Sequence, residues 1–298
     1  MKMLIQITFN NGLGNLYCGI VDVLHYVKTH KELGYKAELI FASNGNSGGN
    51  KYIDNVSLDE IFDINDFDVF ENIRNVHSSI STKTFEDYHY HSTQYGPDYP
   101  GAHWWDVFYD TPPKIEIPKP AHNVERLLTK EQLPEFLPKL NKIVYDKVDL
   151  ILSEKQIDGV IQVRHLDYHI NPSDDFKNLV DKLYERVTKS NLTYYLTSNN
   201  QYLIDKLSGL PNIVIYKYKN LDILPNDHNY FMTHKHVSRD ILLERLYDNL
   251  CEMVLLEKFN KVYHYTSFSW ISTFLYYSRA KNPVQHVIDI KQDLTLIE

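Results

Sequence analysis

Hydrophobic positions near the start of the chain change from strand-like to helix-like spacing and back. Ile5, Ile7 and Phe9 alternate as in a half-buried strand, and a glycine turn follows. Apolar residues then recur at helical spacing until Gly34, after which residues 37–41 read as a second strand. This order predicts a βαβ unit, in which the two strands are parallel and the crossover is right-handed.

The second half of the chain repeats this alternation. Strands are predicted over 159–163, 192–196, 212–216, 261–265 and 285–290, and helices over 176–187, 203–207, 238–253 and 268–277. Ser238 is predicted to cap the third of these helices. Strands that alternate with helices indicate an α/β fold, and such sheets bind ligands outside the carboxyl ends of their strands.

The middle of the chain is less regular. A short strand is predicted over 76–80, aromatic and histidine residues are concentrated over 88–109, and a helix is predicted over 137–153. Because 298 residues exceed the usual size of one domain, we predict two domains. The expected boundary lies beside this helix, which gives domains 1–153 and 154–298.

Composition narrows the class of protein. Apolar residues make up 43% of the chain, which is enough for a globular core, and 31 basic against 39 acidic residues give a net charge of −8. This balance argues against a general nucleic-acid-binding surface. Cys18 and Cys251 are far apart and lack metal-ligand spacing, which fits a reduced compartment. With no long apolar stretch, we expect no integral membrane segment and a cytoplasmic protein, and the oligomeric state stays open.

Three loops at predicted carboxyl ends of strands carry candidate chemistry: residues 10–15, 164–168 and 266–270. Glycines at 12 and 14 allow close backbone approach to a ligand. Arg164 carries a planar guanidinium that suits a diphosphate, and hydroxylated residues before a helix favour an anion. Structural interpretations stay open: a plain strand-to-helix turn, an internal Arg164–Asp167 ion pair, and helix capping by Ser267 and Ser269.

The order of these loops resembles the fucosyltransferase-like superfamily of GT-B glycosyltransferases, especially the galactoside α-1,2-fucosyltransferase group and, more distantly, the α-1,6 and protein O-fucosyltransferases. Residues 11–15 match its Gly-Gly-Leu-Gly-Asn-like loop, and residues 162–168 match a His-x-Arg-x-x-Asp-Tyr-like motif. Residues 198–200 match a Ser-Asp-Asp-like strand end. Residues 266–270 match a Ser-Ser-Phe-Ser-Trp-Trp-like motif, with Ile271 in place of the second tryptophan.

The resemblance implies a GT-B-like α/β fold of two Rossmann-like domains facing across a cleft, with an acceptor-side first domain and a nucleotide-sugar-binding second domain. It implies donor-binding roles for Asn11, Gly12, Gly14, Asn15, Arg164, Asp167, Asn199, Thr266, Ser267, Phe268 and Ser269. It also implies inverting transfer from GDP-fucose, with no metal or other cofactor. Gln162 stands where the family has histidine, and Asn199 and Asn200 replace an acidic pair.

Inverting transfer needs a base for the acceptor hydroxyl, and Asp174 and Asp175 follow the arginine motif at a suitable spacing. Both also fit as the N-cap and first-turn acids of the next helix. The acceptor side is assigned to residues in the aromatic segment: Tyr90, His91, His103, Trp104 and Trp105. The alternative for this segment is a core role.

Two metal interpretations have weaker support. His89, His91 and His103 lack a complete zinc ligand set, and Asp66-Phe67-Asp68 resembles a GT-A metal motif but is interpreted as a solvated turn. The sequence therefore predicts a glycosyltransferase whose partners are a nucleotide sugar and a glycan acceptor. Two alternatives remain: a transferase with another donor, such as GDP-rhamnose or a UDP-sugar, and a non-catalytic carbohydrate- or nucleotide-binding relative.

Overall fold

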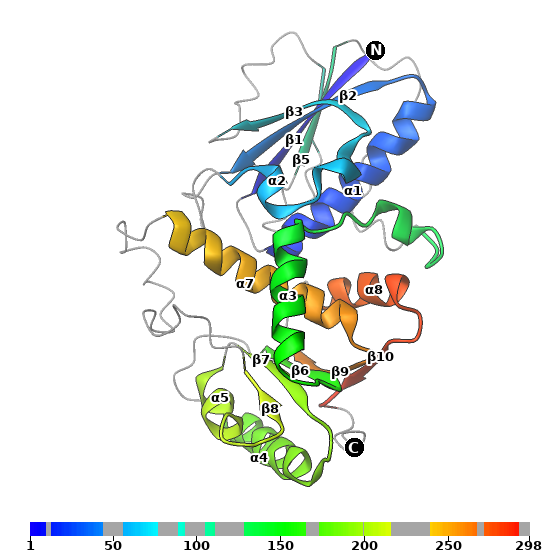
Figure 1. The fold of residues 1–298 in the computed structure, drawn as a ribbon. Coiled ribbons are helices and arrows are strands. Elements are labelled where there is room, and N and C mark those ends of the chain that lie inside the picture. Colours follow the sequence, from blue (N-terminus) through cyan, green and yellow to red (C-terminus); the bar gives the residue numbers. More distant parts are fainter. Residues whose placement is uncertain are drawn as a thin grey trace. The chain divides into compact units, whose positions relative to one another are not determined.

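The chain forms two compact units in the computed structural model (Figure 1). The structure describes residues 1–9, 13–43, 56–76, 89–92, 105–110, 128–164, 173–198, 200–215, 239–266 and 271–291. Unit 1 comprises residues 1–142 and 237–246, and unit 2 comprises residues 143–236 and 247–298. Each unit contains one five-stranded sheet.

Unit 1 begins with the predicted βαβ unit. β1 (Lys2–Phe9) and β2 (Lys36–Ser43) pair in parallel along their whole length, and α1 (Leu13–Glu32) connects them. Gly34 follows the helix with a φ of 84°, and its N–H donates to the carbonyl of Lys31. This left-handed conformation is unfavourable for residues with a Cβ, so glycine ends the helix here as the sequence predicts.

The sheet of unit 1 is mixed, with the strand order β3-β2-β1-β5-β4. β3 (Phe70–Val76) is parallel to β2, whereas β5 (Trp105–Tyr109) is antiparallel to both β1 and β4 (His89–Ser92). The hydrophobic pattern did not indicate β4 or β5. Of the strand predicted over 76–80, only Val76 is described, as the last residue of β3, and residues 77–80 lie outside the described residues.

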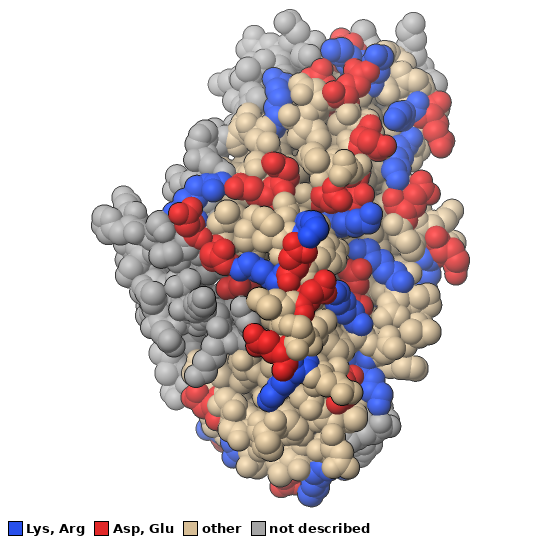
Figure 2. Space-filling view, viewed as in Figure 1, with Lys and Arg blue, Asp and Glu red and all other residues tan. Residues whose placement is uncertain are grey.

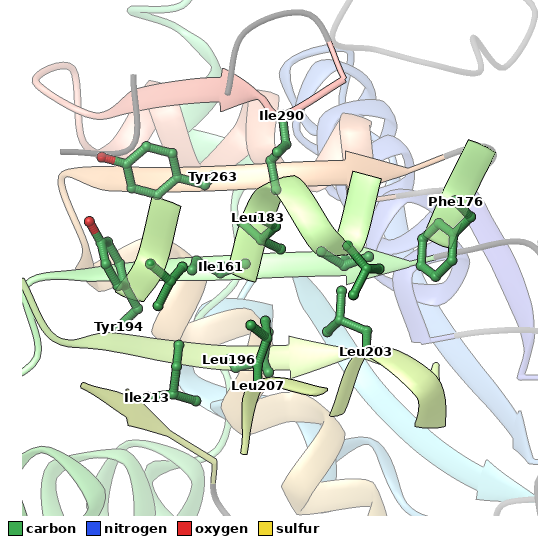
Figure 3. Packing of buried hydrophobic residues seen from close by; sticks show 13 residues of the cluster. Ile161, Phe176, Leu183, Tyr194, Leu196, Leu203, Leu207, Ile213, Tyr263 and Ile290 are labelled. Carbon is green, nitrogen blue, oxygen red and sulfur yellow. The ribbon is translucent and has the colours of Figure 1, made fainter. Parts of the chain in front are cut away.

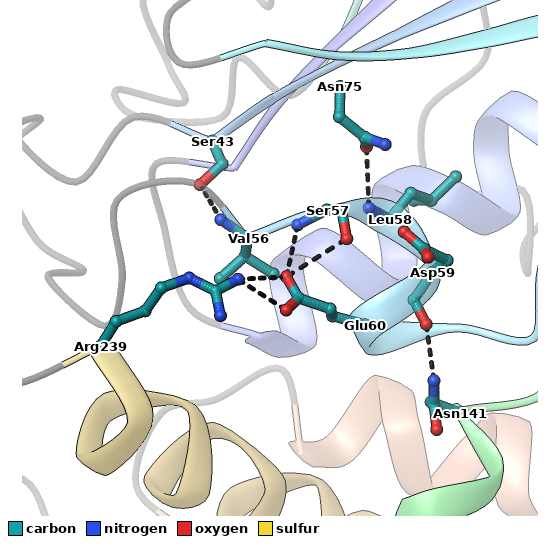
Figure 4. Close-up of polar contacts among 9 residues, drawn as sticks. All are labelled: Ser43, Val56, Ser57, Leu58, Asp59, Glu60, Asn75, Asn141 and Arg239. Atoms are coloured by element: carbon teal, nitrogen blue, oxygen red, sulfur yellow. Dashed lines mark hydrogen bonds and ion pairs between the residues drawn. The ribbon is translucent and has the colours of Figure 1, made fainter.

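A short helix, α2 (Leu58–Ile61), begins with a capping box in unit 1. The N–H and hydroxyl of Ser57 both bond the Glu60 carboxylate, which also accepts two bonds from Arg239 at 2.6 and 2.7 Å (Figure 4). Arg239 is the first residue of α7 (Arg239–Lys258). The same carboxylate therefore caps α2 and fixes the start of α7 within unit 1.

Unit 2 contains a wholly parallel sheet with the strand order β10-β9-β6-β7-β8. The strands are β6 (Gly159–Arg164), β7 (Tyr194–Ser198), β8 (Ile213–Val214), β9 (Lys261–Thr266) and β10 (His286–Asp289). Its helices are α4 (Asp174–Lys189), α5 (Gln201–Leu207) and α8 (Ile271–Lys281), together with α3 (Lys142–Glu154) from its second residue onward and the later part of α7.

One face of this sheet is buried against α4 and α5. Ile161 on β6 and Tyr263 on β9 pack with Phe176 and Leu183 on α4 and with Leu203 on α5 (Figure 3). All five side chains are at least 98% buried. The alternating strand positions therefore supply the core, as the strand period requires.

The helix predicted over 137–153 begins later, at Lys142. The preceding residues pair with the end of α2 instead: the N–H of Asn141 donates to the carbonyl of Ile61, and the N–H of Asp63 donates to that of Lys139. These backbone bonds hold residues 139–141 extended, so a helical turn cannot form there.

The two units also divide at a different place from the expected boundary at residue 153. α3 belongs to unit 2 from residue 143 onward, because it is attached to the later part of α7. The Cys251 thiol donates to the Val144 carbonyl, and Lys147 pairs with Asp248 at 3.9 Å. Residues 237–246 belong to unit 1, so both units are discontinuous in sequence.

Candidate functional site

The sheet of unit 2 has a topological switch point between β6 and β9. From β6 the chain continues to β7 and β8 on one side, and later returns to β9 and β10 on the other. The last residues of the two strands, Arg164 and Thr266, are Cα partners in this register. Open α/β sheets bind ligands outside the carboxyl ends of strands at such a point.

Two sequence loops therefore leave the sheet from adjacent positions. The arginine motif continues from Arg164 into residues 165–172, and the serine motif continues from Thr266 into residues 267–270. Of the predicted donor residues, Asp167, Ser267, Phe268 and Ser269 lie outside the described residues, as do Asn11, Gly12 and Asn199. The described backbone nevertheless places the starts of both motifs side by side, at the carboxyl ends of the neighbouring strands β6 and β9.

A third strand end adjoins these two and is held by hydrogen bonds. Ser198, the last residue of β7, is the Cα partner of Val163, and its hydroxyl donates to the Val163 carbonyl at 2.8 Å. The same hydroxyl accepts from the N–H of Asn200 at 3.0 Å. The Asn200 side chain in turn caps α5 by accepting from Leu203. Asn200 thus has a local structural role as the N-cap of α5.

Asp174 and Asp175 occupy the first turn of α4. Ser173 is the N-cap, and its hydroxyl accepts from the N–H of Phe176 at 3.3 Å. The Asp174 side chain is 93% exposed and pairs with Lys177 at 3.3 Å. The structure thus confirms both as first-turn acids and makes Ser173 the cap. The charge of Asp175 also acts on the Tyr265 phenol, whose pKa is raised mainly by burial and then by Asp289 and Asp175.

In unit 1, β1 and β2 end side by side at Phe9 and Ser43. Gly14 and Asn15 lie in the first turn of α1, which begins directly after the glycine-containing loop. β5 enters the sheet at Trp105, whose Cα partner is Ile7 near the carboxyl end of β1. The start of α1 and the start of β5 therefore both adjoin the carboxyl end of β1.

No protein-family model matches the sequence, and no curated protein matches it. Solved structures do match it over nearly its whole length. The chain has the fold of the α-1,6-fucosyltransferase NodZ.

The structure of NodZ from Bradyrhizobium aligns with a TM-score of 0.54 at 12% identity, and the alignment covers 94% of this chain and 93% of NodZ. NodZ soaked with GDP-fucose gives a TM-score of 0.51 at 11% identity and 92% coverage of each chain. NodZ co-crystallised with GDP gives 0.53 at 12% identity, covering 94% of this chain and 92% of NodZ. The GT-B-like α/β fold class predicted from the sequence is confirmed.

The predicted acceptor residues do not share one environment. Trp105 is 2% exposed, and its ring lies 5.2 Å from that of Tyr26, measured between centroids. Trp105 is therefore a core residue, which favours the alternative core role over an acceptor role for it, because a buried ring has no face on which a sugar can stack. Tyr90 and His91 lie on β4, at the edge of the sheet, and His103 and Trp104 lie outside the described residues.

The structure also bears on the two metal interpretations. The described part of the chain contains no group of three or more His, Cys, Asp or Glu residues placed to hold a metal ion. Residues 64–67 form a short 3-10 helix, and the Asp66 carboxylate accepts from the N–H of Lys139 at 2.6 Å. The Asp66-Phe67-Asp68 motif is therefore a turn, as predicted, although Phe67 is buried rather than solvated.

Electrostatically, the surface is mixed. Figure 2 shows Lys and Arg interspersed with Asp and Glu across the described part of one face. No described helix is long and apolar enough to cross a membrane.

The sequence did not single out one side chain at the switch point, His264 on β9, whose pKa is lowered by burial. The only signal in the sequence was its place between the alternating tyrosines 263 and 265, which indicated a strand but not a polar partner.

Proposed function

We propose that this protein is an inverting, metal-independent glycosyltransferase that moves fucose from GDP-fucose to a hydroxyl of a glycan acceptor. The observation that carries the proposal is the pairing of Arg164 with Thr266 at the switch point of the parallel sheet. The two sequence motifs with anion-binding chemistry start from these residues. NodZ structures with GDP-fucose and GDP support the choice of donor.

In this proposal unit 2 binds the donor and unit 1 serves the acceptor. The Arg164 guanidinium pairs with the diphosphate, and the N-terminal end of α8 faces it with N–H groups and hydroxyls. The acceptor oxygen attacks C1 of fucose while the bond from C1 to the phosphate oxygen breaks. GDP leaves with the bonding electrons, and fixed positive charge stabilises it in the way a divalent ion does in other enzymes.

The acceptor proton goes to a base, and we propose Asp175 rather than Asp174. Both side chains are exposed, but Asp175 acts electrostatically on Tyr265, the residue before the end of β9, whereas Asp174 is paired with Lys177. Replacing Asp175 by asparagine should lower kcat by about 10²-fold or more. Asp174→Asn removes the same first-turn charge from the same helix and should lower kcat far less. If both substitutions lower kcat equally, the loss comes from a less stable α4 helix, and Asp175 is not the base.

The central claim is tested by donor binding. Calorimetry with GDP-fucose, GDP and UDP should show binding of the two guanosine ligands, and Arg164→Ala should abolish it. Arg186→Ala is the matched control, because Arg186 is an exposed arginine near the end of α4. Unchanged affinity in Arg164→Ala would remove the proposal, and preferential binding of UDP would favour another donor.

Transfer itself is tested with a panel of glycans. The sequence resemblance favours an α-1,2 product, whereas the NodZ fold is that of an α-1,6 enzyme, so the product linkage decides between them. Activity should persist in EDTA, and complete loss in EDTA would refute metal independence. Donor binding without hydrolysis or transfer would favour the non-catalytic alternative.

A further inference from the structure

Polar residues form a row across four strands of the sheet in unit 2. Gln162 on β6 and His264 on β9 are Cα partners, and the row continues with Thr197 on β7 and Asp289 on β10. Cross-strand partners in a parallel sheet share a face and lie about 4.8 Å apart. Gln162 and His264 are each two residues before the strand end, or about 6.6 Å below the switch-point rim.

Gln162 and His264 have unused hydrogen-bonding capacity. Gln162 is 4% exposed, yet its Oε1 has no hydrogen-bond partner in the described part of the chain. The buried Nδ1 of His264 likewise has none there. Buried polar atoms in proteins are nearly always paired, because an unpaired one loses its bonds to water without replacement. Two such atoms on adjacent strands, directly below a predicted ligand site, therefore indicate a binding role.

The chemistry of the two atoms defines what they can bind. Gln162 Oε1 can only accept a hydrogen bond. Burial lowers the pKa of His264 more than the nearby Asp289 charge raises it, which favours a neutral ring, and Nδ1 of a neutral ring accepts when Nε2 carries the proton. Two neighbouring acceptors match two neighbouring donors. A phosphate carries almost no protons at neutral pH, whereas a vicinal diol supplies two.

We propose that Gln162 and His264 form an accepting pair that binds a vicinal diol of the nucleotide sugar. The inference rests on the proposed function, and the diol comes either from the ribose or from the transferred sugar. Gln162 and His264 both lie two residues before the strand ends, and His264 is only partly buried. The pair thus adds specificity for a hydroxyl-rich ligand to the charge-based binding at Arg164.

The test combines ligand affinity with the stability of the free protein. Gln162→Met and His264→Phe keep the approximate shape of each side chain but remove the acceptors. Each substitution should weaken ligand binding by about tenfold. Neither should lower the urea midpoint of the free protein, because removing a buried polar atom that has no hydrogen-bond partner costs no hydrogen bond. Thr197→Val is the matched control: it removes a buried hydroxyl from the same row, one strand away from the switch point, and should leave affinity unchanged.

Three ligands identify the source of the diol by calorimetry. If the ribose supplies it, both substitutions weaken GDP binding, but only the one whose acceptor pairs with the 3′-hydroxyl weakens 2′-deoxy-GDP binding. If the sugar supplies it, only GDP-fucose binding weakens. Wild-type affinity of both variants for all three ligands overturns this inference alone, and so does a loss of free-protein stability without loss of affinity. Failure of the wild-type protein to bind any of them overturns the proposed function as well. If one variant does not fold, the other still decides.

Discussion

A methyl group added at Gly159 should weaken the junction between β6 and β9. A Cβ at this position would lie 3.1 Å from the Lys261 carbonyl oxygen and 3.4 Å from the Lys261 Cβ. The first distance is shorter than ordinary van der Waals contact. Because the oxygen belongs to the backbone of a paired strand, it cannot rotate away, and the strands must separate by a few tenths of an ångström. We expect Gly159→Ala to cost about 1–3 kcal/mol of unfolding free energy, the usual effect of overpacking.

Gly209→Ala is the matched control in the same unit. No described atom lies within 4 Å of a Cβ there, and Gly209 does not have a positive φ. Alanine restricts the unfolded chain, so this variant should be unchanged or more stable by up to about 1 kcal/mol.

Urea unfolding followed by circular dichroism measures both free energies, with the slope m as a check that the same surface is exposed. Equal midpoints for Gly159→Ala and Gly209→Ala would refute the reasoning, since they would show that the close approach to Lys261 does not limit strand pairing.

Two further predictions concern hydrogen bonds and pH. Ser198→Ala loses the hydrogen bonds to Val163 and Asn200 and should lower the unfolding free energy, measured in urea, by about 1–2 kcal/mol. Ser153→Ala loses one exposed hydrogen bond within α3 and should lower it much less. Equal losses would contradict a special role for Ser198. His30 is 1% exposed, its Nε2 has no partner in the described residues, and burial lowers its pKa below 6.5. The unfolded chain therefore binds a proton first as pH falls through 6.5, so stability should decrease from pH 7.5 to 5.5, and the decrease should be smaller in His30→Phe. An identical pH dependence in wild type and variant would rule His30 out as a contributor.

Much of the fold followed from local pattern. The βαβ start, the helix end at Gly34 and the alternating second half were all predicted, because strand and helix periods and glycine conformation act over a few residues. The strands β4 and β5 were missed. β5 pairs with β1, whose residues lie about 100 positions earlier in the chain, and β4 joins the sheet only through β5. An aromatic-rich segment has no period that distinguishes an edge strand from residues packed in the core.

The sequence by itself determined which residue types are available for the site: a guanidinium at Arg164, hydroxyls from Thr266 onward and acids at the start of α4. Only the tertiary structure decided which of these meet. Strand order is a non-local property, so the register that pairs Arg164 with Thr266, and Gln162 with His264, could not be read from spacing along the chain. Burial is equally non-local, and it turned Trp105 from an expected sugar platform into a core residue.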